Sequence, residues 1–479
     1  MGRDELQQVR SERDAMEVAE PQAPAAPTEA APIPAKRGFF QLRWRWRVLL
    51  ALGVAVYYLI WAATAFDKVN PTDLDIFFLP AAKIAVQGRP LYVYSLRVGI
   101  YPNANGPLSL IPLTFAAWLA HVRGWLGDPY LRRMLVFAVC APFPLLVGWE
   151  AARAVDRFGP PLVGIARALL YLPIIFTPLL WLDALYYGHI EQTMVVWLAL
   201  AATRLMADGR YLRSGALLGL ALLARSDASL IVLALLLTLL VYRRWRGALL
   251  TATATVGALT LGLAPFLLAD GRDVIFSLFT FRGALPVGGG DLWSLSNADI
   301  FLAVAQHLDA IVTLMVAILL ILIAHLVRSD LDLNIPDIYG LLTVASFCFA
   351  LLIKTLWPYY FLESALFATV WALAAMPRAG ALQSKATFGR WLAWASLWLA
   401  PLGVTACAVI SEYGLEANNY DGWIEPWISA NILCGIGTLT ICMAALLGGR
   451  WVWSTTGKDV APATGGILAE SALDPAIEG

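Results

Sequence analysis

The chain has 479 residues and a formal net charge of +0, and 59% of its residues are hydrophobic while only 14% are charged. This balance is more apolar than that of soluble globular proteins, and the absence of a positive excess argues against a nucleic-acid partner. Five cysteines stand singly without CxxC spacing, which predicts small buried side chains rather than disulfides or a metal site. The composition therefore predicts an integral membrane protein with membrane lipids as partners.

Two tails flank the apolar region. Residues 1–36 are rich in Pro, Ala, Glu and Gln, so we predict a disordered cytoplasmic tail over 1–46. The first apolar segment, Val48 to Phe66, is too long for a signal-peptide core and is expected to stay as a signal anchor. A transmembrane domain over 47–448 and a second cytoplasmic tail over 449–479 complete the predicted organisation.

Apolar stretches of about 17 to 25 residues recur along the domain and predict an all-α polytopic membrane protein with about 12 or 13 transmembrane helices. Arginine and lysine clusters before the first span and between later spans place the N-terminus and these loops in the cytoplasm. The remaining gaps are then extracytoplasmic: 67–105, 183–192, 225–227, 270–299, 354–360 and 412–427. Nearly all unusual polar residues fall in these outer gaps.

Two parts of this pattern are irregular. The stretch 107–121 is short and contains two prolines, which predicts a re-entrant or interfacial helix and leaves the number of spans at 12 or 13. From Leu74 to Gln87 apolar residues dominate until Gly88-Arg89-Pro90, which predicts a helix lying in the outer membrane interface. The loop 270–299 is predicted to hold a second ordered outer segment.

Asp73 and Asp75 follow the first span and are the candidate catalytic residues. A carboxylate held here can act as a general base, and it can also bind a divalent cation, although no cofactor is predicted and no metal ligand is assigned. The alternative is helix capping, with an acid in the first turn offsetting the helix dipole. Side chains two positions apart diverge on a helix, so at most one of the two acids should face a given cavity.

The sequence Gly188-His189-Ile190-Glu191-Gln192 opens a span at the outer face. His189, Glu191 and Gln192 are candidate substrate-binding residues, because ionisable groups at a membrane boundary need a cavity or a partner. Histidine can bind a phosphate when protonated, and glutamate can accept hydrogen bonds from sugar hydroxyls. The alternative is a polar helix start at the headgroup level.

Arg225, in Arg225-Ser226-Asp227, interrupts an apolar run and is a candidate for binding a phosphate bidentately. The alternative is an Arg225–Asp227 pair that closes the hairpin. Lys354, Tyr359 and Tyr360 combine a cation with aromatic faces that suit a phosphate and a sugar, unless Lys354 snorkels in an aromatic belt. Weaker candidates of the same kind are Arg282, Asp291 and Glu363.

Several nucleotide and hydrolase signatures are absent from the sequence. It contains no GxxxxGK[ST], GxGxxG, HExxH or GxSxG motif. A nucleotide-driven pump and a serine hydrolase are therefore disfavoured. A nucleotide-sugar donor is also disfavoured, because such donors are cytoplasmic and the polar residues lie on the outer side.

The polar motifs resemble the integral-membrane GT-C glycosyltransferases, and most closely family 87, which uses polyprenyl-phosphate sugars. The resemblance covers about 65 to 250, and beyond 250 it rests on hydropathy. Its residues are Asp73, Phe77-Phe78, Pro80-Ala81-Ala82-Lys83, Gly88 and Pro90-Leu91-Tyr92; Tyr101-Pro102 through Asn105-Gly106-Pro107-Leu108; Gly188-His189-Ile190-Glu191-Gln192; and Leu218-Gly219 through Ala224-Arg225. The chain departs from the family in having Asn-Gly-Pro for a double proline and Arg225 for a lysine followed by proline.

The resemblance implies a GT-C-like bundle with outer amphipathic helices and an inverting transfer in which an outer-loop aspartate is the base. It implies that a hexose, mannose by likeness, moves from a polyprenyl-phosphate donor to an extracytoplasmic lipid or glycan acceptor at the inner or plasma membrane. Tyr101 and Asn105 then join the substrate-binding candidates. Spacing to Pro80 and Gly88 favours Asp73 as the base, but Asp75 stays open.

Two other classes remain as alternatives. A glycan ligase or polymerase that uses a lipid-linked oligosaccharide would have the same outer polar face. A secondary transporter would also have many spans and intramembrane charges. A transporter should, however, show paired broken helices in two related halves, and no such internal repeat is visible in the sequence.

Overall fold

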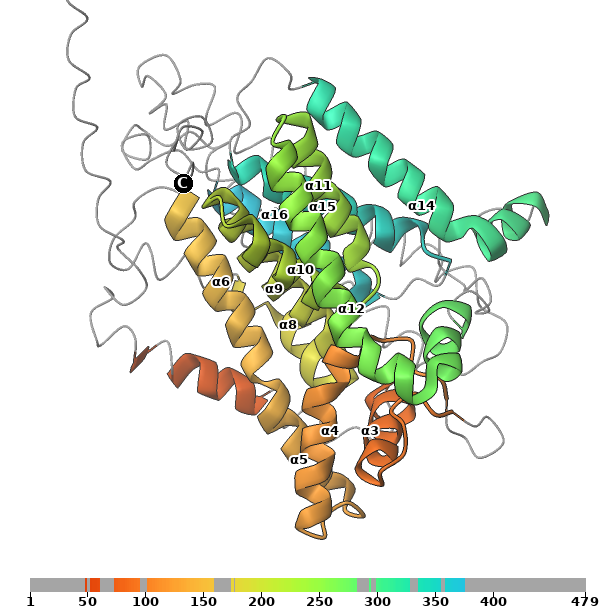
Figure 1. Cartoon of the computed structure of the whole chain (residues 1–479). Helices are drawn as coiled ribbons and strands as arrows, with labels where there is room; N and C mark the ends of the chain where they lie inside the picture. Colours follow the sequence, from red (N-terminus) through yellow and green to blue (C-terminus); the bar gives the residue numbers. More distant parts are fainter. Residues whose placement is uncertain are drawn as a thin grey trace, which may run out of the picture. The chain divides into compact units, whose positions relative to one another are not determined.

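The computed structural model describes part of the chain, and all of that part lies in the compact unit Leu42–Gly479 (Figure 1). The other unit, Met1–Gln41, and the predicted tails 1–46 and 449–479 lie outside the described residues. The described residues are 48–49, 52–60, 73–94, 101–158, 174–175, 177–281, 293, 299–327, 335–354 and 358–374.

Every regular element in this described part is a helix, so the predicted all-α class is confirmed. One helical stretch covers 52–60. The others, in chain order, are η2 (Leu74–Phe78), α3 (Leu79–Val86), α4 (Pro107–Val122), α5 (Pro129–Cys140), α6 (Pro142–Phe158), α8 (Pro178–Trp181), η4 (Leu182–Tyr187), α9 (Ile190–Ala207), α10 (Tyr211–Ala224), α11 (Ala228–Val241), α12 (Trp245–Ile275), η5 (Phe276–Thr280), α14 (Asp299–Val327), α15 (Ile335–Leu352), η7 (Pro358–Phe361) and α16 (Leu362–Ala374).

The helices form a bundle that leaves large apolar side chains on its surface. On α12, Leu261 is 78% exposed and Leu268 is 87% exposed, and α14 presents Met315 at 65%. Such surfaces are costly in water and favourable in hydrocarbon. Two described helical stretches, Pro129–Arg157 and Trp245–Thr280, are long and apolar enough to cross a membrane by length and composition. The count of 12 or 13 spans stays a prediction.

Helices α10 and α12 pack closely because glycines line their contact (Figure 1). Gly215 and Gly219 form a GxxxG pattern on α10, and a Cβ at either position would meet backbone oxygens of α12 at 2.2 and 2.6 Å. The Thr255 hydroxyl donates to the Gly215 carbonyl at 3.1 Å and to the Thr251 carbonyl at 2.8 Å. Small residues that let two backbones approach are typical of helix pairs in membranes.

The predicted helix over Leu74–Gln87 is present as η2 followed by α3, and it packs against α4. It ends at Gly88, whose φ of 79° is the left-handed conformation that favours glycine. Its position in the membrane interface stays a prediction. Helix α4 is 16 residues long, about 24 Å, and its re-entrant or interfacial position stays a prediction.

Two boundaries differ from the sequence-based expectation or refine it. The apolar stretch predicted over 131–149 lies in one helical run, Pro129–Arg157, in which α5 and α6 join at Ala141, directly before Pro142, and Ala141 itself has helical backbone angles. Proline lacks an N–H and clashes with the preceding turn, so it begins a helix more easily than it continues one. In α12 the backbone leaves the helical region at Asp270, where the predicted outer loop 270–299 begins. Of that loop, 282–292 and 294–298 lie outside the described residues.

Candidate active site

The start of the η2–α3 segment and the start of α9 meet through a histidine. His189 Nε2 lies 2.9 Å from Asp73 Oδ2, and its Nδ1 lies 2.5 Å from Glu191 Oε1. Asp73 is the residue that precedes η2, and His189 is the residue that precedes α9. Two of the motifs predicted from sequence, 116 positions apart, are therefore joined in one hydrogen-bonded chain.

The turn before α9 positions His189. Gly188 follows the last residue of η4 and has φ 75°, which reverses the chain direction. The His189 N–H then donates to the Asp183 carbonyl at 3.0 Å. A Cβ on Gly188 would lie 2.6 Å from Leu74 Cδ1. Glycine therefore allows both the left-handed turn and the close approach of η2, which carries Asp73 to His189.

His189 is held as an imidazolium. Its ring has a carboxylate oxygen beside each nitrogen, and only the doubly protonated ring can donate to both. Burial alone would lower the pKa of His189, but the charge of Glu191 and hydrogen bonds to Asp73 and Glu191 raise this pKa well above its usual value. The Asp73 side chain is 31% exposed, so this carboxylate is also open to solvent.

Asp75 has different neighbours from Asp73. Its two oxygens lie 3.3 Å from Arg132 Nη2 and 2.5 Å from Arg133 Nη2, both on α5. Its side chain is 12% exposed. The divergence expected for two acids two positions apart is thus observed, with Asp73 directed to α9 and Asp75 to α5. Asp75 joins the η2–α3 segment to α5.

Arg225 ends α10 and is 2% exposed. Its Nε lies 2.8 Å from Asp227 Oδ2, and its guanidinium lies 4.7 Å from the ring centre of Tyr360 and 5.5 Å from that of Phe349. Burial alone would lower the pKa of Arg225, but Asp227 and other neighbouring groups outweigh this effect and raise the pKa above its usual value. The side chain therefore stays charged. The pair predicted to close the hairpin is present, and it is buried against two aromatic rings.

Tyr101 and Asn105 lie in an extended segment that reaches the same end of α10. The Tyr92 hydroxyl donates to the Asn105 carbonyl at 2.8 Å, and the Gly106 N–H donates to the Ala224 carbonyl at 3.0 Å. A Cβ on Gly106 would lie 2.0 Å from the Leu223 carbonyl oxygen, so only glycine fits. Asn105 is therefore placed next to the residue that precedes Arg225, and the Tyr101 ring contacts the Phe77 ring in a tilted arrangement with ring centres 5.5 Å apart.

The remaining candidates are distributed over different places. Gln192 is fully buried in the first turn of α9, and its N–H donates to the His189 carbonyl at 3.3 Å. The Lys354 ammonium donates to the Gln306 carbonyl at 3.2 Å, which ties it to α14. Tyr360 contacts Arg225, whereas Tyr359 lies in η7 with its side chain outside the described part. The weaker candidates Arg282 and Asp291 also lie outside it.

Two further buried acids belong to this region. Asp183, in η4, is fully buried, and burial raises its pKa well above the usual value, while the charges of His189, Glu191, Arg225 and Asp73 act on it. Glu363 on α16 is 3% exposed, and its charge acts on Arg225. Sequence reasoning missed Asp183, although a single acid within an apolar stretch of the predicted outer gap 183–192 was a usable signal.

We refer to Asp73, Asp183, His189, Glu191, Arg225, Asp227 and Glu363 as the polar cluster. It holds five acids and two basic groups, so a neutral or positively charged region of a substrate would be favoured near the acids and an anion near Arg225. Among the described residues, no group of three or more His, Cys, Asp or Glu side chains could hold a metal ion. A pocket of about 440 Å³ is found at the opposite end of α10 and is not part of this cluster.

Comparison with known proteins leaves the family open. No protein-family model matches the chain. A search of curated proteins found no match either. The crystal structure of ArnT from Cupriavidus metallidurans in the apo state is similar with a TM-score of 0.43 and 16% sequence identity, over 85% of this chain and 78% of that chain. A TM-score of this size does not establish a common fold.

Proposed function

We propose that this protein is a GT-C-type glycosyltransferase that moves a hexose, in the first instance mannose, from a polyprenyl phosphate to an extracytoplasmic lipid or glycan acceptor. The observation that carries the proposal is the Asp73–His189–Glu191 chain. It supplies a solvent-accessible carboxylate directly before η2, held by a buried cation. The proposed location is the inner or plasma membrane, with the site on the outer face.

Asp73 is the proposed general base. In an inverting transfer the acceptor hydroxyl loses its proton to the base, its oxygen bonds to the anomeric carbon, and the polyprenyl phosphate leaves with the bonding electrons. A base must reach the acceptor hydroxyl, and Asp73 is 31% exposed. Asp75 is less accessible to an acceptor in this scheme, because both of its oxygens contact arginines and its side chain is only 12% exposed.

His189 is proposed to fix the direction of Asp73. One Asp73 oxygen accepts the hydrogen bond from His189 Nε2, so the carboxylate cannot rotate away from the head of α9. Glu191 holds the other ring nitrogen and keeps the imidazolium in place. A positioned catalytic group contributes more than a mobile one because its orientation is set before the reaction.

Arg225 is proposed as the cation nearest the leaving phosphate. It ends α10 beside the Asn105–Gly106 segment, and Tyr360 stacks on its guanidinium. Its pairing with Asp227 is also what a purely structural hairpin closure requires, so the two roles are separated by the Arg225 variants described below. An arginine fork matches two phosphate oxygens, which a lysine cannot do.

The function can be tested with purified protein in lipid. Radiolabelled mannosyl phosphoryl polyprenol and a lipid extract as acceptor are incubated with the protein, and transfer of label is followed. Label released from the carrier into an acceptor supports the proposal. Transfer of label only from lipid-linked oligosaccharides would favour a ligase or polymerase, and label that crosses the vesicle membrane without a change of carrier would favour a transporter.

A further inference from the structure

The other end of the α9–α10 and α11–α12 hairpins carries a second basic region. Both hairpins turn with the same backbone conformation. In the first, Gly209 has φ 72° and Arg210 has φ −86° and ψ 60°; in the second, Arg243 has φ 56° and Arg244 has φ −88° and ψ 56°. The two loops thus present arginines at matching positions at the starts of α10 and α12.

Arg243 stands in the left-handed region where the equivalent residue of the first turn is glycine. Among the described residues it is the one non-glycine with positive φ. A side chain in this conformation is strained relative to glycine. Arg243 thus adds a charge and costs backbone conformational energy, and such strain is concentrated at positions where the side chain has a function.

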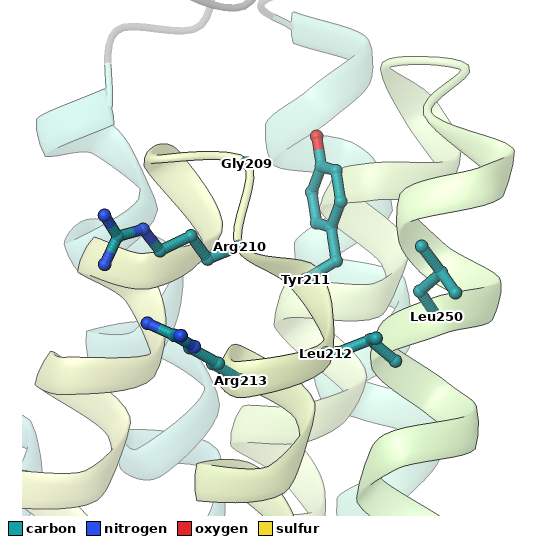
Figure 2. A pocket seen from close by; sticks show the side chains of 6 residues that line it. All are labelled: Gly209, Arg210, Tyr211, Leu212, Arg213 and Leu250. Carbon is teal, nitrogen blue, oxygen red and sulfur yellow. The ribbon is translucent and has the colours of Figure 1, made fainter. Parts of the chain in front are cut away.

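Packing brings these two helix starts together. A Cβ on Gly247 would lie 2.8 Å from the Tyr211 ring, so Tyr211 sits directly on the first turn of α12. Arg210 and Arg213 project to the same side of α10, while Leu212 points toward Leu250 (Figure 2). Arg246 and Leu250 are four positions apart on α12 and share a face. The pocket of about 440 Å³ formed here is lined by Gly209, Arg210, Tyr211, Leu212, Arg213 and Leu250.

The charge of this region is not neutralised within the described part of the chain. No ion pair is found there for any of its five arginines: Arg210, Arg213, Arg243, Arg244 and Arg246. The neighbouring acid, Asp208, pairs instead with Arg157 at 3.2 Å. Neither α10 nor α12 has a side-chain cap at its N-terminus, so both helix dipoles add to the positive potential.

Apolar side chains adjoin the arginines. Leu212 is 56% exposed, Trp245 is 64% exposed and Leu249 is 67% exposed. A ligand that matches both parts has an anionic head and an apolar tail. A tryptophan next to arginines is also the arrangement found at the level of lipid headgroups.

We propose that this region, the arginine pocket, binds the phosphate headgroup of an anionic phospholipid from the adjacent leaflet. Arg210 and Arg213 contact the phosphate, Arg246 and the loop arginines add to the potential, and the acyl chains lie along Leu212, Leu249 and Trp245. Basic pockets between membrane helices are suited to anionic lipids for this reason. The inference does not depend on the proposed transferase activity.

The test uses the purified full-length chain in detergent and phosphatidylglycerol as the probe, with bound lipid counted by native mass spectrometry. Arg210→Ala/Arg213→Ala should raise the half-saturating concentration of phosphatidylglycerol by about tenfold or more, since each arginine near a membrane surface strengthens binding by about fivefold. The matched control, Arg89→Ala/Arg123→Ala, removes the same charge from exposed positions elsewhere and should leave binding within about twofold. Added salt should weaken binding to the parent.

Arg243→Gly separates binding from folding. Glycine fits the left-handed turn, so this variant should melt at the same or a higher temperature than the parent, and it should still bind phosphatidylglycerol more weakly. Equal binding of the parent and Arg210→Ala/Arg213→Ala would overturn the proposal. So would equal occupancy by phosphatidylcholine, an equal loss in the control, or displacement of the lipid by millimolar inorganic phosphate, which would identify a soluble anion as the ligand.

Discussion

At the scale of single residues, the two acids at the start of the η2–α3 segment have different environments. Asp73 accepts a hydrogen bond from His189 and is 31% exposed, whereas Asp75 contacts two arginines and is 12% exposed. The two acids are two positions apart at the start of a helix, so their side chains point in different directions and meet different neighbours. The pair therefore divides into a group that can meet a substrate and a group that holds the segment to α5.

His189 should make stability depend on pH. Its pKa is raised in the folded protein by Glu191 and Asp73 against the effect of burial. A raised pKa adds stability that is fully present below the unfolded value of about 6.5 and is lost as pH rises through the folded value. We therefore expect the melting temperature to fall as pH increases above about 6.5. Calorimetry or a fluorescence melt at several pH values measures this.

The matched variant is His189→Gln. Glutamine keeps hydrogen-bonding capacity but has no charge that titrates, so the part of the pH dependence due to His189 should disappear. If the melting temperatures of the parent and the variant change with pH in the same way from pH 6.5 to 9, an imidazolium at this position is contradicted.

Arg225 variants separate donor binding from hairpin closure. If the guanidinium binds the donor phosphate, Arg225→Lys should raise the donor KM and Arg225→Ala should raise it more. The total loss of donor binding free energy should be about 1 to 3 kcal/mol. If Arg225 only closes the turn with Asp227, Arg225→Ala and Asp227→Ala should both lower the melting temperature and leave the donor KM unchanged. Donor KM and melting are measured on the same preparations.

The sequence predicted the individual residues of the site better than their partners. His189, Glu191 and Arg225 were visible because polar side chains are unusual at the ends of apolar helices. The contacts of Asp75 with Arg132 and Arg133 were not predictable, because those arginines lie 57 and 58 positions away on α5. Asp183 was missed although a single acid in an apolar stretch was a usable signal, and its proximity to His189 and Arg225 became visible only in the structure.

At the scale of elements, the turn before α9 controls how closely η2 approaches. Gly188 has φ 75° and leaves room for Leu74, the first residue of η2. The same segment presents Asp73 to His189. The active geometry thus depends on a backbone conformation and on the absence of a side chain at one position.

Gly188→Ala should damage both stability and transfer. A methyl group there is strained by the positive φ and overlaps Leu74, and together these effects should cost about 2 to 4 kcal/mol. Gly209→Ala is the control, because Gly209 has φ 72° but open space around its Cβ direction. It should show the strain without the displacement of η2, so a loss of transfer equal to that of Gly188→Ala would contradict this explanation.

Helix boundaries show what periodicity can and cannot give. The stop at Gly88-Arg89-Pro90 and the short helix after Pro107 were predicted from glycine and proline chemistry, and both are present. The junction between α5 and α6 was not, because hydropathy runs through Ala141 without a change. Pro142 was the available signal, and its effect depends on whether neighbouring helices compensate for the missing hydrogen bond.

At the scale of the whole molecule, composition predicted the all-α class and apolar surface, whereas the number of spans and their direction remain predictions. The basic loops predict that Arg213 lies inside and that the polar cluster lies outside. In a background without the five native cysteines, Ser226→Cys should therefore react with an impermeant thiol reagent added to intact cells, and Arg213→Cys should react only after lysis. Both positions are exposed, so burial does not confound the comparison. Reaction of Arg213→Cys alone from outside would reverse the orientation.

The most direct test of the central claim is transfer of labelled mannose from mannosyl phosphoryl polyprenol by the purified parent, Asp73→Asn and Asp75→Asn. Asparagine preserves shape but cannot accept the proton, so Asp73→Asn should fall by about 10²-fold or more in turnover while its melting temperature stays close to that of the parent. Asp75→Asn should lower the melting temperature, because it loses the charge that contacts Arg132 and Arg133, and it should lower turnover less than Asp73→Asn does. Near-parental turnover by a well-folded Asp73→Asn variant would contradict the assignment of Asp73 as the catalytic base.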